Sequence, residues 1–299
     1  MDRLYAVAYA PLFFVSFLAA GVAAIDIWQL PLVSLVGLAG LAILVSFLAE
    51  RRWPQELEWN GIHADTPRDV AHASVNELLN IGGIALWGTA AAALAPEALQ
   101  GLWPHEWPLG AQVLVAIVIA DVGFTLAHFA SHRIPWLWRL HAVHHSVTRM
   151  YGFNGLMKHP LHQMVEAGAA FAPLLLLGAP SEVAAMVGYA ALIQLLLQHS
   201  NVAMRIGALR HVFAWAPVHR FHHMKYGASG DVNFAFFFSF WDRLLGTSFH
   251  TAAHRITTRD LGIGSRADFP VGYLAQLSDP FRQVKKNDVP ETPPELRSR

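Results

Sequence analysis

The 299-residue sequence contains no cysteine. A disulfide scaffold, a thiolate metal site, an iron–sulfur cluster and a cysteine nucleophile are therefore excluded. Charged side chains are also scarce, at 14% of residues against about 25% in an average soluble domain. Positive and negative charges balance, so the composition gives no indication of a nucleic-acid partner.

Hydrophobic residues take the place of the missing charge and make up 54% of the chain. Four apolar runs are each close to the ~20 residues that a helix needs to cross a bilayer; they cover residues 5–24, 30–49, 75–95 and 109–127. Two shorter runs, 165–177 and 183–197, are separated by a Gly-Ala-Pro break and predict a helical hairpin. The expected fold is all-α, an integral membrane bundle of about four spans plus this hairpin.

Lysine and arginine fall in separate blocks along the chain. They are absent from the three stretches that contain the apolar runs, residues 4–50, 69–132 and 159–204. By the positive-inside rule, the basic segments between and after these stretches are expected in the cytoplasm. The sequence therefore predicts a multi-pass membrane protein with a histidine-rich helical cap on the cytoplasmic side.

Three regions are expected along the chain. Residues 1–110 would form N-terminal transmembrane helices, residues 111–255 a histidine-bearing catalytic domain, and residues 256–299 a polar C-terminal tail. From about residue 283 this tail is polar and proline-rich, so we expect it to be disordered.

Histidine is unusually frequent, with 17 copies against 21 lysines and arginines together. Eight of them are closely spaced: His128 and His132 as HxxxH, His141, His144 and His145 as HxxHH, and His219, His222 and His223 as a second HxxHH. Residues three and four apart share one face of a helix, so each motif presents its imidazoles together. Eight ring nitrogens exceed the needs of one tetrahedral zinc, so the set predicts two metal ions.

The expected topology brings these motifs to one side of the membrane. His128 and His132 end the fourth span, His199 ends the hairpin on the same side, and the two HxxHH motifs lie in cytoplasmic segments. Isolated residues such as His105 and His254 are expected to be ordinary surface or capping histidines.

These motifs together resemble the fatty acid hydroxylase and sterol desaturase superfamily. Five strings support the resemblance, which covers roughly residues 115–250: LWRLHAVHHS at 137–146, KHP at 158–160, QHSN at 198–201, HRFHH at 219–223 and DVNFAFFFSFWDRLLGT at 231–247. One departure concerns fatty-acyl hydroxylases of the superfamily, which carry a further histidine four residues before the position that matches His199. This chain has Leu195 there.

The resemblance implies a membrane-bound non-haem centre of two irons, which uses dioxygen to hydroxylate or desaturate a lipid C–H bond. The implied metal ligands are His128, His132, His141, His144, His145, His199, His219, His222 and His223. His159 and His162 are possible additional ligands. Five polar residues are candidates to hydrogen-bond the ligands from behind: Asp121, Asn201, Asp231, Asn233 and Asp242. Asp231 and Asp242 could instead be turn or cap residues, and Asn201 a helix-end residue.

The implied reaction needs partners. The substrate would be a lipid that enters from the bilayer. The aromatic residues of segment 234–241 could line its path, or they could be an interfacial belt or core packing. The chain has no dinucleotide fingerprint, so two electrons must come from an external donor, a ferredoxin or a small cytochrome with its reductase. Four basic residues could dock such a carrier, or merely be cytoplasmic charge: Arg205, Arg210, Arg220 and Lys225.

Two other functions stay open on the residues alone. A membrane zinc hydrolase with a histidine-rich site would need no electron donor. A non-enzymatic haem-binding or metal-transporting membrane protein would be expected to carry ionisable residues in the middle of its spans, which are almost bare of them before residue 121. The identity of the bound metal distinguishes these functions from an oxygenase.

Overall fold

The computed structural model describes residues 2–61, 63–94, 99, 101–283 and 287–296. Within these residues the chain is helical, with three isolated β-bridges and no strand. Four helical stretches are long and apolar enough to cross a membrane: Leu4–Ile27, Ser34–Arg52, Leu109–Arg133 and Ser181–Gln198. The expected all-α membrane bundle with about four spans is confirmed. An uninterrupted apolar helix satisfies its own backbone hydrogen bonds, which is what a bilayer demands.

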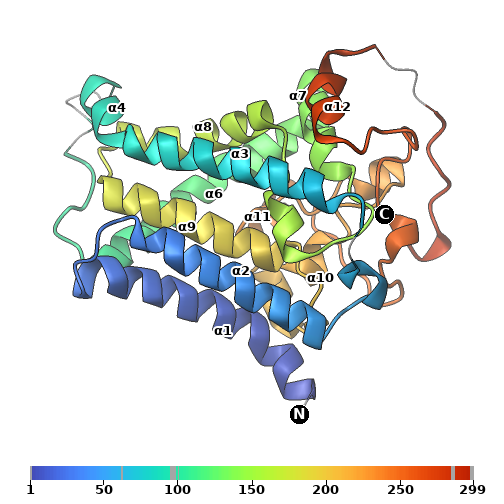
Figure 1. Cartoon of the computed structure of the whole chain (residues 1–299), viewed down its shortest axis with the longest axis horizontal. Helices are drawn as coiled ribbons and strands as arrows, with labels where there is room; N and C mark the ends of the chain where they lie inside the picture. The colour runs from blue at the N-terminus through green and yellow to red at the C-terminus, as the bar shows by residue number, and fades with distance from the viewer. Residues whose placement is uncertain (1, 62, 95–98, 100, 284–286, 297–299) are drawn as a thin grey trace.

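The long helices lie side by side (Figure 1). Among the described helices they are α1 (Asp2–Val22, extended by a π-helical turn to Ile27), α2 (Ser34–Arg52), α3 (Thr66–Ala85), α6 (Leu109–Arg133), α8 (Pro160–Leu176) and α9 (Ser181–Gln198). Three short helices gather toward the end of the bundle where α2 finishes and α3 begins: α7 (Pro135–His145), α10 (Ala216–His219) and α12 (Tyr273–Ser278). We call this end, residues 133–159 and 199–281, the cap. A fourth short helix, α11 (Phe240–Leu245), lies beside the middle of α6, where the indole N–H of Trp241 donates to Asp121.

Two of the expected spans differ in detail. The run at 75–95 is not one straight helix, because α3 begins already at Thr66 and turns by 55° into α4 (Trp87–Leu94). In the hairpin, the second arm α9 is long enough to span a bilayer, and the first arm α8 is shorter. The hairpin turns at Gly178, whose φ of 79° favours glycine.

Helices α6 and α9 form the centre of the bundle. Helix α6 packs against α7, α8 and α9, and α9 also packs against α1 and α2. Gly123 allows α6 to touch the backbone of α8, since a Cβ placed there would lie 2.1 Å from the carbonyl oxygen of Ala169. The first two helices therefore share one core with the histidine-bearing segment. The boundaries at residues 110 and 255 stay a prediction.

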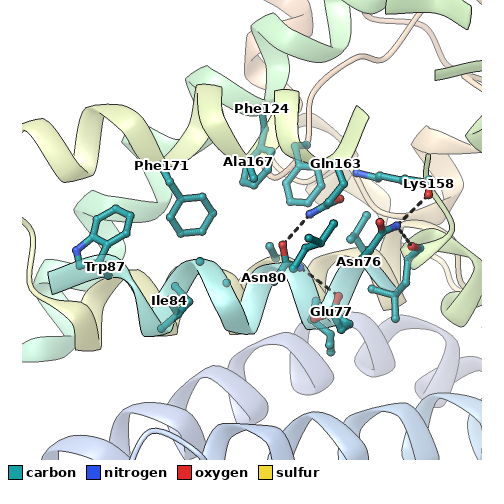
Figure 2. A pocket seen from close by; sticks show the side chains of 18 residues that line it. Asn76, Glu77, Asn80, Ile84, Trp87, Phe124, Lys158, Gln163, Ala167 and Phe171 are labelled. Carbon is teal, nitrogen blue, oxygen red and sulfur yellow. Dashed lines mark hydrogen bonds between the residues drawn. The ribbon is translucent and has the colours of Figure 1, made fainter. Parts of the chain in front are cut away.

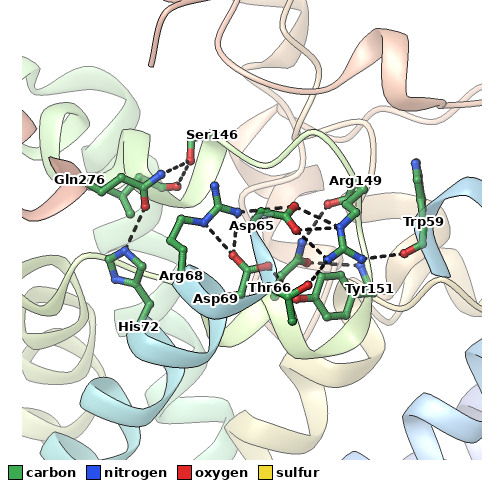
Figure 3. A network of polar contacts seen from close by, with 12 residues as sticks. Trp59, Asp65, Thr66, Arg68, Asp69, His72, Ser146, Arg149, Tyr151 and Gln276 are labelled. Carbon is green, nitrogen blue, oxygen red and sulfur yellow. Dashed lines mark hydrogen bonds and ion pairs between the residues drawn. The ribbon is translucent and has the colours of Figure 1, made fainter. Parts of the chain in front are cut away.

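A buried polar network fastens the cap to α3 (Figure 3). Arg149 donates to Asp65 at 2.8 Å and to the carbonyl oxygen of Trp59 at 2.7 Å. The Tyr151 hydroxyl donates to Asp69 at 2.7 Å, and Asp69 also pairs with a neighbouring arginine of α3. The loop that follows the first HxxHH motif is thereby held to the start of α3.

The C-terminal tail is more ordered than its composition indicates. A 3-10 turn at Pro294–Leu296 buries Leu296, which is 2% exposed, in a cluster with Trp59, Met150 and Phe221. The expectation of disorder is therefore wrong for this turn, because one leucine supplies an apolar anchor. Residues 284–286 and 297–299 of the tail lie outside the described residues.

The close approach at Gly123 gives a test of the packing. We expect Gly123→Ala to lower the free energy of unfolding by about 1–3 kcal/mol, because the new methyl group overpacks the contact between α6 and α8. Thermal unfolding in detergent measures the change. Gly168→Ala is the matched control, since a Cβ at Gly168 has no neighbour within 4 Å. Equal melting temperatures for the two variants would contradict the tight contact.

Candidate metal centre

Nine buried histidine side chains meet in two groups where the cap joins the end of α6. In each group the ligand nitrogens all lie within 4.8 Å of one another. The first group consists of His128, His132, His141, His145 and His222, and the second of His144, His199, His219 and His223. These are the nine residues that the sequence and the resemblance predict as ligands, and the structure brings all of them together.

Helix geometry explains how the motifs divide between the groups. On α7, His141 and His145 share one face and join the first group, whereas His144 points into the second. The second HxxHH motif divides in the same way, with His222 alone in the first group. A proline opens α7, where its fixed φ suits the first turn, and this sets where the helix and its histidines begin.

The first group contains a contact that a hydrogen bond cannot explain. Nδ1 of His128 lies 2.8 Å from the carbonyl oxygen of Phe234, and Nδ1 of His222 lies 2.7 Å from that of Val232. A carbonyl only accepts, so both Nδ1 atoms carry a proton, and in the neutral form of each buried ring the Nε2 atom then carries a lone pair. These two Nε2 atoms are 2.8 Å apart. Two facing lone pairs repel each other, so a cation between them is what this geometry fits.

The second group follows the same rule. Nδ1 of His144 donates to the carbonyl oxygen of Met157 at 3.0 Å, and Nδ1 of His199 donates to Oδ1 of Asn154 at 3.1 Å. Nε2 of His199 has no hydrogen-bond partner. Burial lowers the pKa of His144 well below its usual value and that of His199 to about 3, so both rings are neutral. Neutral imidazole with a free nitrogen is the form that binds metal.

Distances between ring nitrogens also fit metal ligands. The Nε2 atom of His145 lies 3.1 Å from those of both His132 and His141, and Nε2 of His223 lies 3.0 Å from that of His219. Two ligands at right angles, each about 2.1 Å from one ion, are about 3 Å apart. The rings of His145 and His223 are 4.6 Å apart, so the two groups adjoin.

Of the five residues predicted to lie behind the ligands, Asp231 is in direct contact with a ring. Its carboxylate accepts from Nδ1 of His132 at 2.9 Å. Asp242 accepts from the backbone N–H of Phe234, and Asp121 accepts from that of Phe237. Both carboxylates therefore hold the backbone segment whose carbonyl binds His128.

Asn233 and Asn201 serve the backbone instead. Asn233, at a left-handed φ of 54°, donates to the carbonyl oxygens of Val218 and Phe249 and so closes the turn after the last motif. Asn201 bonds the backbone of Glu56 through both ends of its amide, which ties the end of α9 to the segment after α2.

The two additional candidates occupy different places. His159 caps α8, where its Nδ1 accepts from the backbone N–H of Leu161, and its Nε2 donates to the carbonyl oxygen of Leu277. His162 lies beside the first group, with its ring 4.4 Å from that of His141. His141, His162 and Glu166 could also hold an ion together.

Several parts of the site are absent from the sequence-based prediction. Asn154, which orients His199, has no motif to mark it. Lys158 and Glu166 form a buried ion pair near the histidines, with 2.5 Å between Nζ and Oε2. The sequence marks only Lys158 of this pair, as the first residue of the KHP string. Arg220, a docking candidate, is in fact buried and donates to the carbonyl oxygen of Val202 at 3.2 Å.

Two cavities adjoin the centre. A polar one of about 340 Å³ is lined by His132, His145 and His222, together with Trp138, Arg133, Asp231, Lys225 and two glycine-rich loops of the cap. The second, mainly apolar and about 160 Å³, lies between α3, α8 and α9, where the Lys158 that pairs with Glu166 lines it (Figure 2). The polar cavity therefore reaches the histidines from the cap, and the apolar one lies within the bundle.

Comparison with known proteins identifies the family. The family described as Fatty acid hydroxylase matches residues 113–247. An ornithine lipid hydroxylase, OlsE of Rhizobium tropici, is 37% identical over 274 residues, which are 88% of this chain and 80% of that protein. The chain belongs to the fatty acid hydroxylase family. It is thus an oxidoreductase, a membrane oxygenase that acts on lipid, and the predicted resemblance is confirmed.

Other members of the family match over about half of this chain. Alkylglycerol monooxygenase of Danio rerio is 29% identical over 145 residues, 48% of this chain and 31% of that protein. Methylsterol monooxygenase 1 of Gallus gallus is 26% identical over 161 residues, 51% of this chain and 53% of that protein. No solved structure matches the chain.

The facing lone pairs of His128 and His222 generate a test of metal binding. We expect His222→Ala to lower the metal content from about two ions per chain to about one or fewer, because it removes a ligand of the first group. Elemental analysis of the purified protein measures this. His105→Ala, a change at an exposed histidine remote from both groups, should keep the wild-type content. An unchanged content in His222→Ala would rule out its role as a ligand.

The contact between Asp231 and His132 generates a second test. We expect Asp231→Ala to weaken metal affinity or activity by about 10–100-fold, because the acceptor that orients the ring is lost. Metal titration of the stripped protein measures the affinity. Asp268→Ala, at an exposed carboxylate that pairs with Arg266, is the control. Equal affinities in both variants would show that the contact does not tune the site.

Proposed function

We propose that this protein is a di-iron hydroxylase of a polar membrane lipid, with ornithine lipid as the first substrate class to test. The pair of unprotonated Nε2 atoms, 2.8 Å apart in His128 and His222, is the observation that carries the proposal. The ornithine lipid hydroxylase of Rhizobium tropici supports the substrate class, since it is alike over most of both chains. The names of the relatives favour hydroxylation over desaturation.

Two irons suit this set of ligands. The nine neutral imidazoles fall into groups of five and four, and imidazole binds iron as well as zinc. When bound, the irons supply the activation of dioxygen, for which the overall reaction is R–H + O₂ + 2e⁻ + 2H⁺ → R–OH + H₂O.

The chain itself fixes the orientations of the ligand rings. Backbone carbonyls of Phe234, Val232 and Met157 keep the Nδ1 protons of three ligands in place. Burial holds the pKa of His219 and His223 well below the usual value, so the rings stay neutral at physiological pH. The site is thus preorganised as a set of lone pairs before any ion arrives.

Electrons would come from an external carrier protein. The polar cavity leads from the cap to the histidines, since three of them line it. The ring of Trp138 lies 4.9 Å from that of His132 at this cavity, and Arg133 and Lys225 add positive charge that suits an acidic carrier.

We place the cap in the cytoplasm. Basic residues cluster where the long helices meet the cap: Arg51 and Arg52 end α2, Arg68 lies in the first turn of α3, and Arg133 ends α6. Short basic flanks of this kind favour the cytoplasmic side of a membrane.

The proposal is tested with iron-loaded protein in vesicles of ornithine lipid, with reduced ferredoxin and oxygen-18-labelled dioxygen. We expect one labelled oxygen atom per product molecule, detected by mass spectrometry, and oxygen uptake that matches product. Zinc-loaded protein should be inactive. His144→Ala should lose activity, and His105→Ala should keep it.

Other outcomes point to the alternatives. Lipid cleavage by zinc-loaded protein without oxygen uptake would favour a hydrolase. A haem spectrum in the purified protein, or no bound metal at all, would favour a non-enzymatic function.

A further inference from the structure

The apolar cavity within the bundle has two chemically different ends (Figure 2). Its walls come mainly from α3, α8 and α9, and Phe124 and Phe236 complete them. A cavity of about 160 Å³ between helices can hold a short segment of a lipid, with its polar part at a defined end. Which end lies next to the histidines therefore decides which part of a lipid is oxidised.

Polar side chains gather at one end. Oδ1 of Asn80 on α3 accepts from the Gln163 amide on α8 at 3.0 Å, and the Asn76 amide donates to the carbonyl oxygen of Lys158, also at 3.0 Å. Lys158 itself is buried, and its ammonium pairs with Glu166. Amide groups and an ion pair offer both donors and acceptors to a polar group of a ligand.

The other end is hydrocarbon. Ile84, Trp87 and Phe171 close it, and Gly188 and Leu192 form the wall from α9. The indole N–H of Trp87 is already used by the carbonyl oxygen of Ala179 at 2.9 Å, so its ring offers apolar surface. The rings of Trp87 and Phe171 meet edge to face at 6.0 Å.

Helix register places the polar end beside the metal centre. Lys158 at the polar end pairs with Glu166, and a carboxylate oxygen of Glu166 lies within 4.8 Å of a ring nitrogen of His141. Leu195 also lines the cavity and comes four residues before His199, which follows α9. Four residues are about one helical turn, or about 6 Å. Ile84 lies eight residues beyond Asn76 on α3, about 12 Å further from the cap.

We infer that the lipid binds with its polar group among Asn80, Gln163 and Lys158 and with its hydrocarbon chain toward Trp87. The carbon that is oxidised then lies in the polar part of the lipid or directly beside it, not far along an acyl chain. This inference rests on the proposed function and deepens it. It makes Gln163 and Gly188 specificity-determining residues, one for each end of the cavity.

A substitution at Gly188 tests whether the lipid occupies this cavity. A Cβ at this position meets no atom within 4 Å, so Gly188→Leu would place its side chain in open space at the hydrocarbon end. Gly168→Leu is the matched control, because Gly168 is equally open but does not line the cavity. Retention of ornithine lipid by the purified protein, measured by native mass spectrometry, needs no metal or turnover.

We expect Gly188→Leu to reduce retention of long-chain ornithine lipid at least tenfold, and Gly168→Leu to leave it unchanged. Gln163→Leu should also weaken retention, because it removes the amide at the polar end. Equal retention in Gly188→Leu and Gly168→Leu would overturn the assignment of the cavity.

The position of the oxygen-18 label in the product tests the orientation of the bound lipid. Tandem mass spectrometry of the oxygen-18 product should place the new hydroxyl in the headgroup fragment or on a carbon next to it. A label in the distal half of an acyl chain would overturn the inference. Lipid retention that depends on Gly188 without any labelled product would contradict the proposed function and leave the cavity supported as the lipid site.

Discussion

The structure depends on one unfavourable contact, the approach of two imidazole lone pairs in His128 and His222. Backbone carbonyls fix the protons of both rings on Nδ1, so the two Nε2 atoms face each other at 2.8 Å without a proton between them. Such repulsion is tolerated only where a cation compensates it. Much of the surrounding architecture holds these rings in place against it.

That architecture connects the membrane bundle to the cap. Asp121, in the middle of α6, accepts from the backbone of Phe237, and Asp242 accepts from that of Phe234. A buried carboxylate is costly unless hydrogen bonds satisfy it, and here backbone N–H groups do so. The segment after the last histidine motif is thereby locked onto the same helix that carries His128.

The sequence was sufficient for the main features of this molecule. Long uncharged runs predict spans because a bilayer allows few alternatives, and HxxHH predicts converging rings because helix periodicity is fixed. Asn154 and the carbonyl of Val232 were not predictable, since they depend on which loop lies behind which ring. Arg220 was misjudged because proximity to a motif in sequence says nothing of burial, whereas Asn201 fits the open alternative of a helix-end residue. The bend after Ala85 could not be predicted either, because no proline or charged residue marks it in the sequence.

The division of each HxxHH motif between two groups has a further consequence. Ions held there would cross-link α6, α7, the end of α9 and the turn at 219–223, segments that span nearly a hundred residues of sequence. Closing such long loops removes entropy from the unfolded chain, and the binding energy of the metal becomes folding energy of the cap. The centre would therefore also act as a structural cross-link. The bilayer keeps the long helices in place, and the ions would hold the segments of the cap together.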